Sequence, residues 1–497
     1  MQLTQTRNLT AGTKALMVFA CAVMTGFMWR VRGDSGWGSM WGMFAVGVML
    51  TLFIFAFLGN RRSMSYEAIP IAVILLGITN GGWGTLNSQM GGYLTSSFPF
   101  AGETADRLVE INPLHGLWMM LLLGFGWMPL FALFIGSLFS KKDYKIKHYV
   151  LLIAVYYVVL LAFKASVSHF ILAVIHPEAV ENFKLGLADQ NIELTPMMAY
   201  IENLGSAAWA KKVPFARNYF TSVDVISAAC AALVSSLASL VILRDKVTAF
   251  LSTGINAVCA FAITAADVFL ILDSDRGLFA SVNPPAFINN CAWSLWEYFT
   301  GFLLGLGIML ILVSLPESLS QGEGRFEYEP IIKNDKLRCA YHAILTFTFT
   351  FGLTLARPVG RRVARTLLDK GYVSDDEVFE IIITAALTAI YFIVACVMAK
   401  KTVVSRGLAV PAAMRCEDYC MKNSALYFGF TALIYFFCGS GADLLELPYS
   451  QMKNPSAFLE TLKGGYLTVA ILMIVSFALY YILFAAAKKK ALKTENN

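Results

Sequence analysis

The chain of 497 residues is 57% hydrophobic and only 14% charged, whereas a soluble domain has about 45–50% apolar and about 25% charged residues. So little charge cannot cover the surface of a soluble protein of this size, which excludes a soluble enzyme and a disordered chain. The net charge of +6, from 39 basic and 33 acidic residues, is too small for a nucleic-acid-binding protein, so no nucleic-acid partner is expected. The composition predicts an integral membrane protein in contact with the lipid bilayer.

Apolar segments long enough to cross a bilayer recur along the whole chain. A hydrocarbon core of about 30 Å requires roughly 20 apolar residues per helix. The first segment follows Arg7 and Lys14 but lacks the small-residue cleavage site of a signal peptide, so we interpret it as a retained membrane helix. The chain is therefore predicted to be an all-α polytopic protein of about twelve transmembrane helices. These are expected near 14–30, 38–58, 66–82, 114–139, 149–175, 221–243, 247–272, 288–314, 338–357, 377–398, 423–443 and 464–487.

The basic residues between these segments indicate the orientation of the chain. Most of the lysines and arginines fall in alternate connections, such as 141–147 and 400–406, and in the tail at 488–493. Cytoplasmic loops carry an excess of Lys and Arg. We therefore expect both termini to be cytoplasmic and the protein to lie in the plasma (inner) membrane.

A recurring dipeptide indicates an internal repeat. Asn-Pro occurs at 112–113, 283–284 and 454–455, at equal intervals, and each copy precedes the last apolar segment of a group of four. Proline is common at the first position of any helix, so chance could supply part of this pattern. The predicted arrangement is three parallel four-helix repeats. They would cover 1–147, 148–320 with an extracytoplasmic loop at 176–220, and 321–497 with a basic C-terminal tail.

Several cations end apolar segments on the side that should carry few positive charges. Arg30 and Arg32 end the first predicted helix, Lys164 occupies the matching place in the second group, and Arg357 ends the ninth helix. One interpretation makes the arginines after 357 the wet face of a surface helix. The other places these cations in a dry site, where arginine binds carboxylate or phosphate groups in a bidentate manner.

Acidic residues in apolar segments are the natural partners of these cations. Asp267 and Asp443 end the third helix of the second and third groups, and pairs Lys164–Asp267 and Arg357–Asp443 would be purely structural. The first group has a glycine at the matching place, so Arg30 and Arg32 are expected to have only Asp34 nearby. The residues predicted to carry buried charge or to couple protons are Lys164, Asp267, Glu297 and Asp443.

Two glycine-rich stretches, 30–42 and 79–92, interrupt the first group of helices. Non-helical backbone at membrane depth is tolerated only where protein or water covers it, as at the binding sites of transporters. Tight turns and close helix packing are the structural alternative. Tryptophans near these stretches could stack on a solute, although most interfacial tryptophans only anchor the chain. The predicted substrate-binding residues are Arg30, Arg32, Asp34, Asn80, Trp83, Asn87, Gln89, His115, Trp296 and Arg357.

No complete metal or cofactor motif occurs in the sequence. His169 and His176 could share one helix face, with Glu178 as a third ligand, but no catalytic metal signature supports this grouping. No metal ion, cofactor or catalytic residue is therefore predicted. The segment 176–220 has apolar residues at roughly helical spacing, which predicts one or two amphipathic helices over the outer face.

These features favour a secondary transporter, not driven by ATP, for a small anionic or sugar-like solute. In this hypothesis the cations and tryptophans bind the solute and the acids carry coupling protons. The alternative is an integral-membrane transferase or hydrolase that acts on a lipid-linked or phosphorylated substrate, with Asp34 or His115 as a base. A non-catalytic role in a larger membrane assembly is a third hypothesis.

Overall fold

A computed structural model of the chain shows a helical protein with two short strands. Strand β1, Ser97–Pro99, pairs antiparallel with strand β2, Leu108–Glu110, so the all-α prediction holds apart from this hairpin. The structure describes residues 10–33, 39–58, 71–76, 97–99, 108–203, 212–272, 283, 285, 288, 291–315, 334, 336–337, 340–341, 344, 357–369, 371–374, 376–404, 424–425, 427–429, 431–436 and 466–495.

Candidate membrane-spanning helices are present within this described part of the chain. Six helices there are long and apolar enough to cross a bilayer, and a helix pair bent by 52° gives a seventh span if it counts as one. The six are Ala11–Arg32, Ile146–Ile175, Ala216–Val241, Lys246–Leu272, Ala292–Ser314 and Thr468–Ala486. A multi-pass membrane protein is therefore the fold class, and the total of twelve spans stays a prediction.

The chain divides into two compact units. The first contains residues 1–81 and 297–497, and the second contains residues 82–296, so the division falls within helix α16 (Ala292–Ser314), after Trp296. The predicted repeats end at 147 and 320 instead. Compactness does not measure internal repetition, so the repeats stay a prediction.

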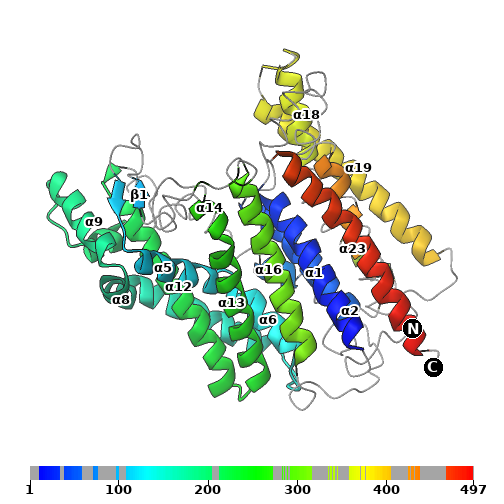
Figure 1. Cartoon of the computed structure of the whole chain (residues 1–497), viewed down its shortest axis with the longest axis horizontal. Helices are drawn as coiled ribbons and strands as arrows, with labels where there is room; N and C mark the ends of the chain where they lie inside the picture. The colour runs from blue at the N-terminus through cyan, green and yellow to red at the C-terminus, as the bar shows by residue number, and fades with distance from the viewer. Residues whose placement is uncertain are drawn as a thin grey trace. The chain divides into compact units, whose positions relative to one another are not determined.

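The second unit is built on two long helices (Figure 1). Helix α12, Ala216–Val241, and helix α13, Lys246–Ala266, lie side by side, and α13 leads into the short helix α14, Val268–Leu272. Helix α7, Ile146–Ala162, packs against α12. Helix α12 is largely buried, and many of its buried residues are serine or alanine, whose small side chains let neighbouring helices approach closely.

A continuous helical path leads from α7 to the segment predicted to be amphipathic. The π-helical turn η2, Phe163–Val167, and helix α8, Ser168–Ile175, extend α7. Helices α9, Pro177–Asp189, and α10, Pro196–Glu202, follow, so the predicted helices within 176–220 are present. Each of the two begins with proline, which fits the first helical position because its missing N–H needs no partner there.

The bent pair consists of α5, Pro113–Phe125, and α6, Pro129–Phe139, and both helices pack against α13. Glycines allow backbone contact near the bend. A Cβ atom at Gly124 would lie 2.5 Å from the Cα atom of Ala260, and one at Gly126 would lie 2.9 Å from the backbone nitrogen of Ala229. The bend is therefore fixed by close contact with the backbone of α12 and α13. A residue larger than glycine at position 124 or 126 would prevent this contact.

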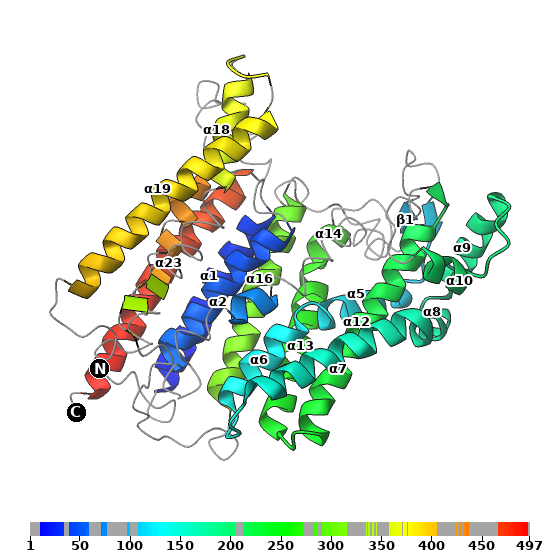
Figure 2. The same ribbon diagram turned by 180° about the vertical axis from the view of Figure 1, so that it is seen from behind.

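The first unit contains α1, Ala11–Arg32, and α2, Ser39–Leu58, together with α18, Arg357–Asp369, α19, Asp376–Val404, and α23, Tyr466–Glu495. Helix α1 packs against both α2 and α23, and α18 packs against α19 (Figure 2). Helix α18 is strongly amphipathic and basic, and the Nε atom of Arg361 lies 3.9 Å from Glu380 of α19. For Arg361 this supports the surface-helix interpretation of the arginines after 357.

Two glycines of α16, four residues apart, bring that helix close to α1. A Cβ atom at Gly301 would collide with the backbone oxygen of Thr25, and one at Gly305 would lie 2.7 Å from the backbone oxygen of Cys21. This spacing is the small-residue pattern of close helix contact in membranes. The part of α16 that belongs to the first unit therefore lies beside the C-terminal half of α1.

Candidate functional site

A buried cluster of charges lies in the first unit, which we call the arginine–glutamate cluster: Arg30, Arg32 and Glu297. The Nη1 atom of Arg30 lies 3.4 Å from the Oε2 atom of Glu297, and their side chains are only 10% and 2% exposed. Arg32 is 3% exposed and also interacts electrostatically with Glu297. The expectation that Arg30 and Arg32 have only Asp34 nearby is therefore wrong, because helix packing brings Glu297 to them.

Local structure explains why the two arginines can end a membrane-spanning helix. They occupy the last turn of α1, where positive charge interacts favourably with the helix dipole. The guanidinium carbon of Arg32 lies 5.1 Å from the ring centre of Trp29, at cation–π distance. The arginines are therefore held by the helix end, an aromatic face and a carboxylate, and not by bulk water.

Gly33 completes this arrangement at the C-terminal cap of α1. A Cβ atom there would collide with both carboxylate oxygens of Glu297. The carboxylate therefore occupies the space that a side chain at position 33 would fill. Gly33 belongs to the glycine-rich stretch 30–42, which we predicted to contribute to a site. The sequence pattern did not indicate that Glu297 would be its neighbour.

Asp267 and Trp296 form a second buried polar contact, in the second unit. Asp267 is fully buried between α13 and α14, and its Oδ1 atom accepts a hydrogen bond from the indole Nε1–H of Trp296. Within the described residues its Oδ2 atom has no hydrogen-bond partner. Trp296 is fully buried as well, so these two predicted site residues lie together.

Lys164 pairs with an aspartate other than the predicted one. Its Nζ atom lies 2.8 Å from the Oδ1 atom of Asp224 on α12, and Tyr200 donates a hydrogen bond of 2.6 Å to the same carboxylate oxygen. The predicted pair Lys164–Asp267 is therefore wrong. Both partners extend from neighbouring spans, since η2 and α12 are in contact.

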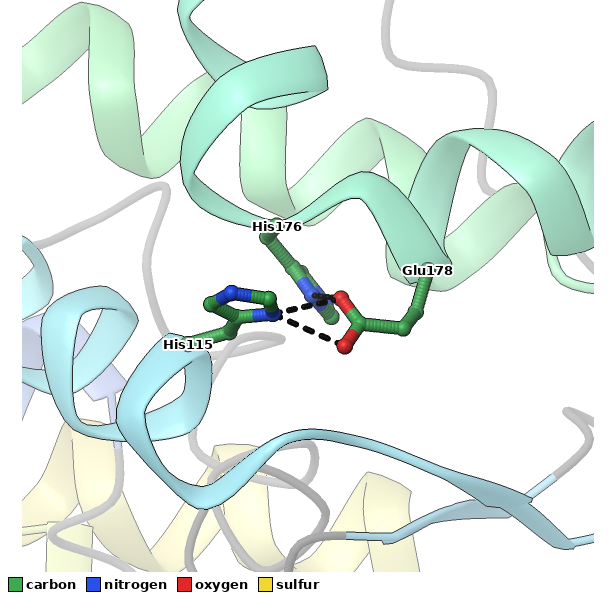
Figure 3. Close-up of side chains that lie close together, drawn as sticks. All are labelled: His115, His176 and Glu178. Carbon is green, nitrogen blue, oxygen red and sulfur yellow. Dashed lines mark hydrogen bonds and ion pairs between the residues drawn. The ribbon is translucent and has the colours of Figure 1, made fainter.

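A partly exposed polar cluster, which we call the His–Glu cluster, contains His115, His176 and Glu178 (Figure 3). The Nδ1 atom of His115 lies 2.8 Å from both carboxylate oxygens of Glu178, and the Nδ1 atom of His176 lies 3.1 Å from Oε2. The His176 side chain is fully buried, whereas His115 and Glu178 are each 25% exposed. The cluster is therefore partly accessible to solvent through His115 and Glu178.

Helix starts and a helix break position the three side chains. His115 lies in the first turn of α5, which Asn112 caps by accepting a hydrogen bond from the N–H of Leu114. His176 separates α8 from α9, and Glu178 follows in the first turn of α9. The backbone N–H of Asn112 also donates to Oε1 of Glu178 at 3.2 Å. The cap of one helix thus orients the carboxylate of the other.

The environment of the His–Glu cluster shifts two of its pKa values. Burial lowers the pKa of His176, and hydrogen bonding and charge interaction with Glu178 offset only part of this effect. Burial would raise the pKa of Glu178, but hydrogen bonds, including those from His115 and from the backbone N–H of Asn112, lower it below the usual value. These shifts favour the ionised form of the Glu178 carboxylate and the neutral form of the His176 ring.

His169 is not part of this cluster. Its Nδ1 atom lies 2.7 Å from the hydroxyl of Tyr219 and its Nε2 atom 2.8 Å from the backbone oxygen of Lys164. The predicted group of His169, His176 and Glu178 is therefore wrong for His169. In the structure, His115 lies beside His176 and Glu178 instead. His115 and Glu178 are 63 positions apart, and no sequence signal indicated their proximity.

For the remaining predicted site residues, the structure gives no side-chain contacts. Arg357 begins α18, for which the backbone at that residue is described. Outside the described residues lie Asp34, Asn80, Trp83, Asn87, Gln89 and Asp443.

Comparisons with protein families, curated proteins and solved structures show no match to this chain.

Proposed function

We propose that this protein is a secondary membrane transporter, not driven by ATP, for a small anionic or sugar-like solute that bears a carboxylate or phosphate group. The observation that carries the proposal is the burial of Arg30, Arg32 and Glu297 at the end of a membrane-spanning helix. Charged groups at such positions are costly, face the protein interior and mark ion or substrate pathways. Guanidinium groups bind carboxylates and phosphates through paired hydrogen bonds.

The ion pair within the arginine–glutamate cluster provides a means of coupling. An anionic solute and the carboxylate of Glu297 compete for Arg30. When Glu297 takes up a proton, its attraction to Arg30 falls, and the guanidinium group is available to the solute. In this scheme a proton and an anion bind together and are released together, so a pH gradient drives uptake.

The proposal includes the topology predicted from the sequence. Twelve spans in three parallel repeats, both termini in the cytoplasm and a location in the plasma membrane are parts of it. The six candidate spans of the described residues support a multi-pass membrane protein. The span total, the repeats and the orientation rest on the apolar segments, the Asn-Pro spacing and the basic loops of the sequence. In this topology the His–Glu cluster faces the outside of the cell.

Uptake by proteoliposomes tests the proposal. The purified chain is reconstituted and supplied with a panel of labelled carboxylates, phosphates and sugar phosphates, with and without an inward proton gradient. We expect gradient-dependent uptake of at least one anionic solute. Arg30→Gln should lower it by about tenfold or more, because a hydrogen bond to a charged group contributes about 1.5–3 kcal/mol.

Two further variants make the test specific. Glu297→Gln should retain solute exchange but lose the response to the proton gradient. Arg361→Gln removes a partly exposed arginine of α18 and should leave uptake unchanged. If no anion shows gradient-dependent flux, or if the Arg30 and Arg361 variants behave alike, the transporter proposal fails.

A membrane hydrolase or transferase is a second candidate, favoured by one observation. His115 is hydrogen-bonded to the carboxylate of Glu178, and an imidazole held by a carboxylate is a common general base. Its substrate would be a lipid-linked or phosphorylated compound at the outer face. Release of phosphate from such lipids that is lost in His115→Gln and kept in Arg30→Gln would support this candidate over transport.

A further inference from the structure

We propose that His115, His176 and Glu178 bind one divalent transition-metal ion of the Zn²⁺ type. The three side chains converge from two segments of the second unit, one at the start of α5 and the other at the junction of α8 and α9 (Figure 3). One ligand atom from each lies within 4.8 Å of the others. This site is separate from the arginine–glutamate cluster and does not depend on transport.

The two nitrogen-to-carboxylate distances within the cluster are close to those that a tetrahedral ion imposes. With metal–ligand bonds of about 2.0–2.1 Å, two ligand atoms of a tetrahedral site lie about 3.3 Å apart. The Nδ1 atoms of His115 and His176 lie 2.8 Å and 3.1 Å from the nearest oxygen of Glu178. Small rotations of the exposed side chains would open the cluster to that size.

The ligand types select the metal. Two imidazoles and one carboxylate suit zinc and its first-row neighbours, whereas calcium and magnesium prefer oxygen ligands. The His176 side chain is fully buried, so packing holds its ring in position at the junction of α8 and α9. Three protein ligands leave a fourth position, which water can occupy because His115 and Glu178 are each 25% exposed.

Neighbouring groups hold the ligands in place, as outer-shell residues do in metal sites. The backbone N–H of Asn112 donates to Glu178, and the buried side chain of Asn218 on α12 interacts with the His176 ring. The competing interpretation is a metal-free hydrogen-bond network that joins α5 to α9. That network predicts no metal retention, so the two interpretations differ in a measurable quantity.

The experiment uses the untagged full chain in detergent. The protein is treated with a chelator, loaded with Zn²⁺ and desalted, and the retained zinc is measured by elemental analysis. We expect about one ion per chain. Because even outer-shell changes lower metal affinity by about 10–100-fold, His115→Gln and Glu178→Gln should weaken binding by at least that factor.

Matched controls separate this site from adventitious binding. His148→Gln removes another partly exposed histidine, and Glu181→Gln removes an exposed carboxylate of α9 whose side chain is 67% accessible. Both should retain zinc like the unmodified chain. Glu178→Gln keeps an oxygen that can accept from His115, so its metal-free fold should match the original by circular dichroism and gel filtration.

A second readout makes the result independent of washing steps. Zn²⁺ should raise the thermal unfolding temperature of the unmodified chain and of the two controls, but not that of His115→Gln or Glu178→Gln. Co²⁺ should give the visible absorption of a tetrahedral site. Absence of retained zinc in the unmodified chain, or equal retention in the Glu178 and Glu181 variants, would overturn the proposal.

Discussion

The carboxylate of Glu297 occupies the space where a side chain of Gly33 would lie, so that these two residues from α16 and α1 fit against each other without any intervening group. The contact links the end of one membrane-spanning helix to the start of another. It also holds the carboxylate that pairs with Arg30. A change at Gly33 therefore tests the arginine–glutamate cluster without altering any charge.

Gly33→Ala should lower the free energy of unfolding by about 1–3 kcal/mol, because the added methyl group would collide with the buried Glu297 carboxylate and force it to move. In a Glu297→Ala background the same substitution should cost less than about 0.5 kcal/mol, since the colliding group is gone. Denaturant unfolding of the four proteins in detergent measures this coupling. Additive effects would show that Gly33 acts elsewhere.

The two neighbouring tryptophans of α16 should differ in their contribution to stability. Trp296 donates its indole N–H to buried Asp267, whereas Trp293 is 44% exposed. Trp296→Phe should therefore destabilise the chain by about 1–3 kcal/mol, the cost of leaving a buried acceptor without its donor. Trp293→Phe should change stability by less than about 0.5 kcal/mol. Thermal unfolding of both variants checks the difference, and equal losses would contradict it.

Neutralising one member of the Lys164–Asp224 pair should destabilise the chain more than neutralising both members. The side chains are 26% and 31% exposed and lie in membrane-spanning helices, so a single remaining charge loses its partner in a poorly solvated place. We expect Lys164→Met or Asp224→Asn alone to cost about 1–3 kcal/mol, and the double variant to be closer to the original. A double-mutant cycle on thermal stability measures this, and a double variant worse than either single one would contradict it.

Asp245 should make the stability of the chain depend on acid pH. It caps α13 between two spans and accepts hydrogen bonds from the backbone N–H groups of Val247 and Thr248 and from the hydroxyl of Tyr144. Burial would raise its pKa, but these bonds and that from the Thr248 hydroxyl lower it below the usual value.

Because the folded pKa is depressed, the stabilisation by Asp245 is present above the unfolded value of about 3.9 and is lost as the pH falls through the folded value. In Asp245→Asn, which retains a capping oxygen, the loss of stability between about pH 5 and pH 3 should be smaller. Unfolding temperatures measured across this range compare the two proteins. Parallel pH profiles would contradict the assignment.

The membrane-spanning helices could be predicted from the sequence because each needs only a local run of apolar residues. The positions of α1, α12 and α16 follow the predicted segments within a few residues at most ends. The arginines at 30 and 32 were also recognisable, since two cations at the end of an apolar run contradict the expected charge distribution. Local sequence patterns cannot predict which residue pairs with each of these charges.

The partners depend on contacts between distant segments. Glu297 reaches Arg30 because Gly301 and Gly305 allow α16 to approach α1, and this four-residue glycine spacing was a signal that the sequence offered. His115 meets Glu178 because the helix break at His176 turns α9 back toward α5. No local periodicity encodes that turn, so the sequence pointed to His169 instead.

The bend between α5 and α6 has a consequence for how the chain is assembled. Gly124 and Gly126 contact the backbone of Ala260 and Ala229, which the ribosome adds only after the bent pair has been made. During synthesis the pair therefore lacks the surface that fixes its angle and covers the backbone at the break. Its final shape is expected to form late, when α12 and α13 enter the membrane.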